Sequence, residues 1–285
     1  MASLLLASLL WSVSFGLIKD TLSGYDPRIV ATIRLALAAL VFAPWLGRAV
    51  LDRWERLGLM ALGAVQFGLM YVLYIASYAT LSGHAVALFT VVTPLYVIGL
   101  EDLAARRRSR RGLIAAALAA AGGAWIVWNG LPGRDAWRGV ALLQGANLCF
   151  AAGQVAYRRW RRNSRAGAAD AGFLAWMYLG AAVLAGIVAA LAGATVSQGF
   201  DRRALWALLY LGLLPTGVGF WLWNRGAVRV SAATVAVMNN LKIPLGVAAA
   251  WLLFGESIDL VRFAPGATVV LLAVVWGTYR TKISD

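Results

Sequence analysis

Long apolar stretches dominate the chain, and short polar or basic segments separate them. Most stretches are about 18–25 residues long, the length that an α-helix needs to cross a hydrocarbon core of about 30 Å. A transmembrane β-barrel would instead show short segments of alternating polarity. The pattern predicts an all-α polytopic membrane protein with ten transmembrane helices, the first of which resembles a helix rather than a signal peptide. The expected spans are 3–20, 27–47, 56–81, 83–103, 112–130, 137–157, 171–193, 204–226, 231–254 and 263–281.

One hairpin pattern occurs twice along the chain. Each copy has a long apolar segment, a tight polar turn and a second apolar segment that contains a Pro-Leu pair. An offset of 150 residues lays Pro94 on Pro244 and Tyr74 on Asn224. Prolines inside apolar segments, at matching places in two halves, point to the binding site of an internally repeated transporter.

The chain divides near Leu131 into two halves of five spans each. An odd number of spans in each half turns the second half upside down relative to the first. We therefore predict two inverted five-helix repeats within one integral membrane unit, covering residues 1–131 and 132–285.

Composition supports the membrane prediction. Of the 285 residues, 61% are hydrophobic and only 13% are charged, whereas a soluble domain has about 25% charged residues. The net charge of +14 does not indicate nucleic-acid binding, because the basic residues cluster at the ends of the spans. Their bias toward one side places both termini in the cytoplasm by the positive-inside rule, and runs such as Arg106–Arg108 and Arg158–Arg162 are interpreted as topology anchors.

Several motifs together resemble the drug/metabolite transporter superfamily, and within it the EamA-type ten-helix exporters. They are Trp11 in the first span, Pro27 followed by Arg34 in the second, the repeated Pro-Leu pair, and the sequence Phe254-Gly255-Glu256. The resemblance is strongest to the YddG-type exporters of aromatic amino acids. It implies a basket-like bundle in the bacterial inner membrane that exports amino acids or related metabolites. One departure is that Arg106 stands where the first half would match Glu256.

Lys242 is the sharpest candidate for substrate binding. It lies near the middle of the ninth span, two residues before Pro244. A charge at this depth costs a few kcal/mol, so it is expected to face a wet cavity or a partner, where it would meet a substrate carboxylate. Amides, hydroxyls and aromatic rings at similar depth would complete the wall. These further substrate-binding candidates are Asn240, Asn239, Trp11, Tyr74, Tyr78, His84, Gln66, Thr93, Trp223, Asn224 and Gln154. Arg34 is interpreted as a structural residue.

Proline and glycine mark the expected hinges. A proline inside a span breaks a backbone hydrogen bond and kinks the helix. The hinge candidates for alternating access are Pro94, Pro215, Gly217 and Pro244.

The sequence also excludes several functions. It has no GxxxxGK[ST] motif, so ATP-driven transport is not expected, and it has no catalytic constellation, metal-ligand set or cofactor motif. The single cysteine, Cys149, cannot form an intrachain disulfide. A membrane-embedded enzyme, a scaffold and a channel remain weaker alternatives. The chemistry predicts a transporter that works without ATP, most simply as a facilitator, and needs only its small-molecule substrate and membrane lipid as partners, with no oligomer required. The runner-up is an exchanger of phosphorylated or carboxylated anions.

Overall fold

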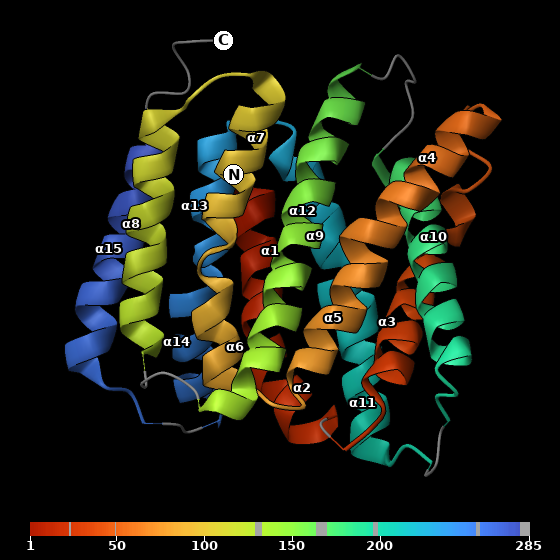
Figure 1. Ribbon diagram of the computed structural model, residues 1–285, viewed down its shortest axis with the longest axis horizontal. Coiled ribbons are helices and arrows are strands. Elements are labelled where there is room, and N and C mark those ends of the chain that lie inside the picture. The colour runs from red at the N-terminus through yellow and green to blue at the C-terminus, as the bar shows by residue number, and fades with distance from the viewer. Residues whose placement is uncertain are drawn as a thin grey trace.

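A bundle of long helices forms the molecule, and Figure 1 shows it as a computed structural model. The structure describes residues 1–22, 24–48, 50–128, 133–163, 170–195, 199–254 and 257–279. All the regular secondary structure in these ranges is helical. Within them, nine helices are long and apolar enough to cross a membrane. The shorter apolar helix α1 (Ala2–Ser12) is followed after one residue by α2 (Ser14–Leu22), and together they cover the first expected span.

The remaining helices follow the predicted spans closely. The first half continues with α3 (Pro27–Phe42) and the short η1 (Ala43–Trp45), then α4 (Arg53–Gly63), η2 (Ala64–Leu69) and α5 (Met70–Ser77), then α6 (Gly83–Thr90) and α7 (Thr93–Ala105), and ends with α8 (Arg110–Val127). The second half contains η3 (Arg134–Ala136), α9 (Trp137–Asn163), α10 (Asp170–Leu191), α11 (Arg202–Leu211), η4 (Gly212–Gly219), α12 (Phe220–Ala227), α13 (Ala232–Asn240), α14 (Lys242–Phe254) and α15 (Leu260–Thr278). The all-α polytopic fold predicted from the sequence is therefore confirmed.

Side-chain caps determine where several helices begin. Asp52 accepts hydrogen bonds from the backbone of Trp54 and Glu55, and Glu55 accepts one from the backbone of Asp52. This capping box satisfies backbone N–H groups that a helix start leaves unpaired. As a result, α4 begins at Arg53, three residues before the predicted start of that span.

Two helices contain π-helical segments at corresponding places. The segments η2 and η4 interrupt the third long helix of each half, between α4 and α5 and between α11 and α12. A π segment has i→i+5 hydrogen bonds and is frequent at functional sites. Pro215 and Gly217, two of the predicted hinge residues, both lie in η4.

Two other predicted spans are each divided into two α-helices instead of containing a π segment. The α-helical hydrogen bonding is interrupted between α6 and α7 and again between α13 and α14, so that Pro94 and Pro244 lie in the first turn of the helix after each break. Proline has no N–H, and its carbonyl partner one turn earlier needs another donor. Thr93 supplies it in the first half, because its hydroxyl donates to the carbonyl of Thr90 at 2.7 Å. The hinge role of all four residues stays a prediction.

Other backbone carbonyls at the α6–α7 break accept hydrogen bonds from side chains of other helices. The amides of Gln144 and Asn147, both from α9, donate to the carbonyl of Phe89 at 3.0 Å. The amide of Asn240, at the end of α13, donates to the carbonyl of Val91 at 2.8 Å. A buried backbone carbonyl needs such partners, so these side chains stabilise the broken helix.

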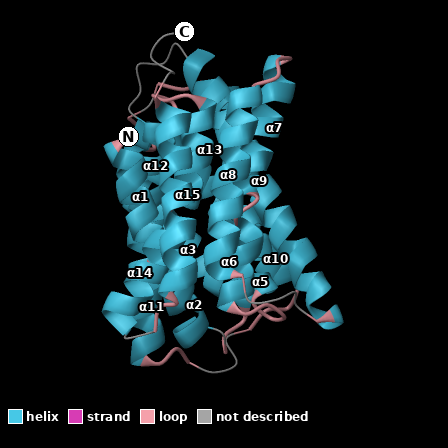
Figure 2. Cartoon of the chain, turned by 90° about the vertical axis from the view of Figure 1, so that its left-hand side faces the viewer, coloured by secondary structure: helices cyan, strands magenta, loops and turns pink. Residues whose placement is uncertain are grey.

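The helices pack with small residues at their closest contacts. Helices α8 and α15 run antiparallel, since Arg111 donates to the carbonyl of Trp276 at one end while Arg262 donates to that of Trp128 at the other. Between these ends, Gly122 lies directly against Gly266. Figure 2 shows the long helices extending between the two ends of the bundle. Helix α10 packs against α3 and α4 on the opposite side of the molecule from α15 (Figure 1).

The contact between α4 and α10 requires glycine on both helices. Gly180 faces the backbone of Met60, and Gly63 faces the backbone of Met177. A Cβ atom at either position would lie less than 3.0 Å from the opposing backbone, a separation that real Cβ atoms essentially never show. Close approach of this kind is how membrane helices gain packing energy without a hydrophobic driving force.

The variant Gly180→Ala is therefore expected to lower the free energy of unfolding by about 1–3 kcal/mol, because the added methyl group forces the two backbones apart. Gly99→Ala is the matched control, since a Cβ there would meet nothing within 4 Å and alanine favours a helix. Chemical unfolding in detergent measures the free energy of unfolding of both variants. Equal stability of the two variants would contradict the close-contact interpretation.

Candidate functional site

An inner cavity of about 90 Å³ lies among α1, α2, α3, α5, α6, α7, α9, α12 and α14. Aromatic and apolar side chains form most of its wall, and these are Trp11, Ile18, Met70, Tyr71, Tyr74, Ala146, Phe150 and Phe220. The polar lining residues are Ser14, Arg34, Thr90, Thr93, Asn147 and Lys242. Two of the fourteen side chains are cationic, and none of these described lining residues is acidic. The cavity can therefore bind a molecule that is partly apolar and negatively charged.

Trp11 organises the aromatic part of this wall. Its ring centroid lies 4.8 Å from that of Phe220 and 6.2 Å from that of Phe150. Its indole N–H donates to the carbonyl of Pro215 at 2.9 Å, which fixes the orientation of the ring. Buried aromatic pairs in such tilted and edge-to-face arrangements contribute about 0.5–1.5 kcal/mol beyond their area. Trp11 thus connects the cavity wall directly to the π segment η4.

Lys242 lines both the inner cavity and a second cavity. It is the first residue of α14, immediately after the break at Leu241, and its ammonium nitrogen lies 5.8 Å from the centroid of the Trp11 ring. The same side chain lines both cavities. The side chain is only partly buried. This position agrees with the expectation that a charge inside a span faces a wet cavity.

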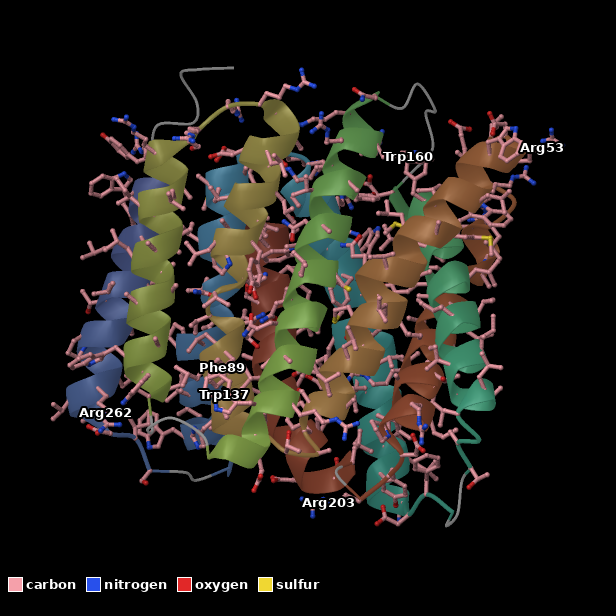
Figure 3. All side chains as sticks on the ribbon, viewed as in Figure 1. Arg53, Phe89, Trp137, Trp160, Arg203 and Arg262 are labelled. Carbon is pink, nitrogen blue, oxygen red and sulfur yellow. The ribbon has the colours of Figure 1, made fainter. Side chains whose placement is uncertain are left out.

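The second, outer cavity has a volume of about 290 Å³ and opens among the ends of several helices. It contains His84, at the start of α6, together with Asp20, Asp259 and Arg262. Arg262 lies at the lower end of the bundle in Figure 3, on the same side as Arg203, while Arg53 and Trp160 lie at the upper end. The lining of the outer cavity therefore includes both Lys242 and residues at the lower end of the bundle.

Arg34, interpreted from the sequence as a structural residue, also lines the inner cavity. Its side chain is 1% exposed and lines the inner cavity. Nη2 donates to the hydroxyls of Tyr71 and Thr216, each at 3.1 Å, and Nε lies 3.3 Å from the Thr216 hydroxyl. The signal was available in the sequence, because Arg34 and Lys242 are the two basic residues that fall well inside expected spans.

Several predicted site residues instead join helices to one another. The amide of Gln66 donates to Asn224 at 3.2 Å, and the indole of Trp223 donates to Gln154 at 3.0 Å. All four side chains are fully buried, and none lines either cavity. Buried amides need hydrogen-bond partners, and here they find them on neighbouring helices. These contacts bring together residues that are far apart in the sequence.

The two asparagines before Lys242 also lie outside both cavities. Asn240 is fully buried and its amide is bonded to Val91, as described above. Asn239 is 1% exposed and does not line either cavity. Only Leu241, whose backbone angles stay in the right-handed helical region, separates α13 from Lys242 at the start of α14.

Of the predicted site residues Tyr74, Tyr78 and Thr93, two line the inner cavity and one does not. Tyr74 and Thr93 line the inner cavity, as expected. Tyr78 lies behind Tyr74, and their hydroxyls are 2.9 Å apart. The lining residues that were not among the predicted site residues include Thr90, Asn147, Phe150 and Phe220, because nothing in their local sequence distinguishes them from packing residues.

Arg158, which the sequence predicts to be a topology anchor, is buried in the structure. Its side chain is 1% exposed, and its Nε lies 3.8 Å from a carboxylate oxygen of Glu101. It also donates a hydrogen bond to the carbonyl of Ala227. Arg158 thus joins α9 to α7 and α12 inside the protein, near the end of the bundle that carries Trp160 in Figure 3. The motif residues Gly255 and Glu256 lie outside the described residues.

The described residues contain no group of three His, Cys, Asp or Glu side chains that could hold a metal ion. The described lining of the inner cavity offers hydrogen-bond donors, cations and apolar surface, which are the groups of a small-molecule binding site.

Comparison with known proteins identifies the family of the chain. The chain is 36% identical to the biotin transporter of Salmonella typhimurium over 280 residues, which cover 97% of this chain and 92% of that protein. It is 35% identical to the biotin transporter of Escherichia coli over 278 residues, with the same coverage. A crystal structure with 15% sequence identity shares the fold over 99% of both chains, with a TM-score of 0.78. The model of the EamA-like transporter family matches residues 1–129 and again residues 137–280. The chain is therefore a membrane transporter and belongs to the EamA-like transporter family.

Proposed function

We propose that the protein transports biotin, or a small carboxylate closely similar to it, through the bacterial inner membrane. The observation that carries this proposal is the charge of the inner cavity, whose described lining has two cations, Arg34 and Lys242, and no acidic residue. A carboxylate would stabilise these cations through charge-assisted hydrogen bonds.

The same observation favours biotin over the aromatic amino acids expected from the sequence. An amino acid carries an ammonium group beside its carboxylate, and that group would lie close to two other cations with no described carboxylate in the cavity wall. Biotin has a carboxylate, a hydrocarbon chain and an uncharged ring system, so it presents no such positive charge. The names of the relatives at 35–36% identity support this choice.

The size of the cavities is consistent with a ligand that occupies both. Small-molecule sites have volumes of about 300–1,000 Å³, which is more than the inner cavity provides. The inner cavity suits a narrow chain and a carboxylate, while the outer cavity of about 290 Å³ suits a wider ring system. Lys242 lines both, so it would lie beside the ligand at their junction.

We further propose that transport proceeds by alternating access between two inverted halves, residues 1–131 and 132–285, with both termini in the cytoplasm. The breaks beside Pro94 and Pro244 and the π segment with Pro215 and Gly217 would absorb the motion, because irregular helix geometry concentrates there. No ATP is required in this scheme.

Uptake of labelled biotin into liposomes that contain the purified protein tests the proposed substrate. We expect saturable uptake that excess unlabelled biotin abolishes, whereas the same excess of phenylalanine or tryptophan leaves it unchanged. Liposomes without protein are the control. Transport of phenylalanine or tryptophan without transport of biotin would refute the proposal and restore the amino-acid interpretation. Transport only in exchange for an internal anion would favour the anion-exchange alternative.

A further inference from the structure

Arg34 is a buried cation whose hydrogen bonds in the described structure all go to uncharged groups. Its partners are the hydroxyls of Tyr71 and Thr216, and its side chain is 1% exposed. Its remaining terminal nitrogen, Nη1, is buried and has no hydrogen-bond partner among the described residues. A buried charge without an opposite charge is costly, and an unpaired donor on it adds to that cost. The lining of the inner cavity therefore includes a buried positive group with a hydrogen-bond donor still available.

The surroundings hold this group in one orientation. The centre of the guanidinium lies 4.5 Å from the centroid of the Tyr71 ring, at cation–π distance. The hydroxyls of Tyr71 and Thr216 are also 3.1 Å apart, so the three side chains contact one another pairwise. Three elements, α3, α5 and η4, contribute one residue each. Nη1 is thus presented by a rigid support, which is what a specific binding site requires.

We infer that Arg34, held by Tyr71 and Thr216, is the residue that binds the carboxylate of the substrate at the inner end of the cavity. This inference rests on the proposed function, because it names the group of that substrate which the inner cavity recognises. The Nη1 donor would form a charge-assisted hydrogen bond with a carboxylate oxygen, which is among the stronger interactions available in a protein interior.

Lys242 has a different part in this arrangement. Its flexible side chain is only partly buried and lines the outer cavity as well as the inner one. Lysine provides a mobile point charge, whereas arginine provides donors in a fixed plane. Arg34 therefore determines that a carboxylate is bound, and Lys242 helps the anion pass between the two cavities.

Equilibrium binding of an acid and its neutral amide tests the role of Arg34. Binding of biotin and of its primary amide to the purified protein in detergent would be measured for the wild type and for Arg34→Gln. We expect the wild type to bind the acid about 10- to 100-fold more tightly, and Arg34→Gln to lose this preference while its affinity for the amide changes less than about twofold.

Two further variants make the measurement specific. Arg203→Gln removes a positive charge from an exposed position at the lower end of the bundle and is expected to keep the full preference (Figure 3). Tyr71→Phe removes one hydroxyl that holds the guanidinium and is expected to reduce the preference several-fold. Tyr71→Phe also provides a readout if Arg34→Gln does not fold, because it keeps the ring and the buried charge.

The possible results separate the inference from the proposed function. If Arg34→Gln folds and still prefers the acid as strongly as the wild type, the inference is wrong although biotin binds. If Arg34→Gln does not fold, a full preference for the acid in Tyr71→Phe has the same meaning. If the wild type binds neither biotin nor its amide, the proposed substrate is wrong, and the same comparison is made with N-acetylphenylalanine and its amide. Absence of a preference for the acid in both pairs would overturn the role of Arg34.

Discussion

Replacing Lys242 by methionine is expected to slow the uptake of biotin into proteoliposomes by about 10- to 100-fold. Lys242 lines both cavities, so a carboxylate that moves between them passes its ammonium group. Methionine keeps a similar length and removes the charge. The remaining path would then be apolar around Trp11, and an anion is poorly stabilised in such surroundings without a charge or donor.

The variant Lys242→Arg is the matched control for this experiment, because it keeps the positive charge and is expected to retain most of the transport rate. Initial rates at several biotin concentrations, together with an unfolding curve in detergent, distinguish a transport defect from loss of fold. Since Arg34 remains in place, the preference of Lys242→Met for the acid over the amide at equilibrium is expected to persist. Unchanged uptake by Lys242→Met would assign Lys242 a purely structural role.

The second large effect concerns stability rather than transport. Replacing Glu101 by glutamine is expected to lower the free energy of unfolding by about 3 kcal/mol, because it removes the negative charge beside buried Arg158. The separation of 3.8 Å is longer than a direct hydrogen bond, so we expect the effect at the lower end of the range for buried pairs.

A double-mutant cycle measures this interaction most directly. Glu101→Gln, Arg158→Gln and the double variant would be unfolded chemically in detergent, with Asp135→Asn as a control at an exposed acidic position. If the pair is coupled, the double variant is less destabilised than the sum of the single variants. Additive effects would show that Arg158 is stabilised by its other contacts, such as its hydrogen bond to Ala227, and not by Glu101.

The positions of the helices were predictable from the sequence because a membrane restricts the choice of structure. Any segment that crosses the hydrocarbon must satisfy its own backbone hydrogen bonds, so long apolar stretches become helices. The third span was predicted to start at residue 56, three residues after the observed start of α4. The capping box of Asp52 and Glu55 sets that start, and hydropathy does not detect such a local polar signal. The helix breaks were predictable from Pro94 and Pro244, since proline removes a donor wherever it occurs.

The binding site was only partly predictable. Lys242 was predicted to face a cavity because a charge inside a span requires an explanation, and the same rule applied to Arg34 would have predicted that both cations line one. Gln66, Asn224 and Asn240 resembled ligand-binding amides, but their partners are 149 or more residues away in the sequence. Polar residues in a membrane span serve either a ligand or another helix, and only the folded arrangement distinguishes the two.

The two π segments also affect how the inner cavity can change over evolutionary time. A π segment accommodates one residue more than an α-helical turn, and it does so within a single turn. Helix α4 can therefore keep its glycine contact with α10. The rotation of α5 about its own axis, which turns Tyr71 and Tyr74 toward the cavity, is not fixed by that contact. The segment η4 separates α11 from Phe220 in the same way. A change of one residue at either segment could rotate the cavity wall and leave the outer scaffold intact, so one bundle could acquire new substrates without being repacked.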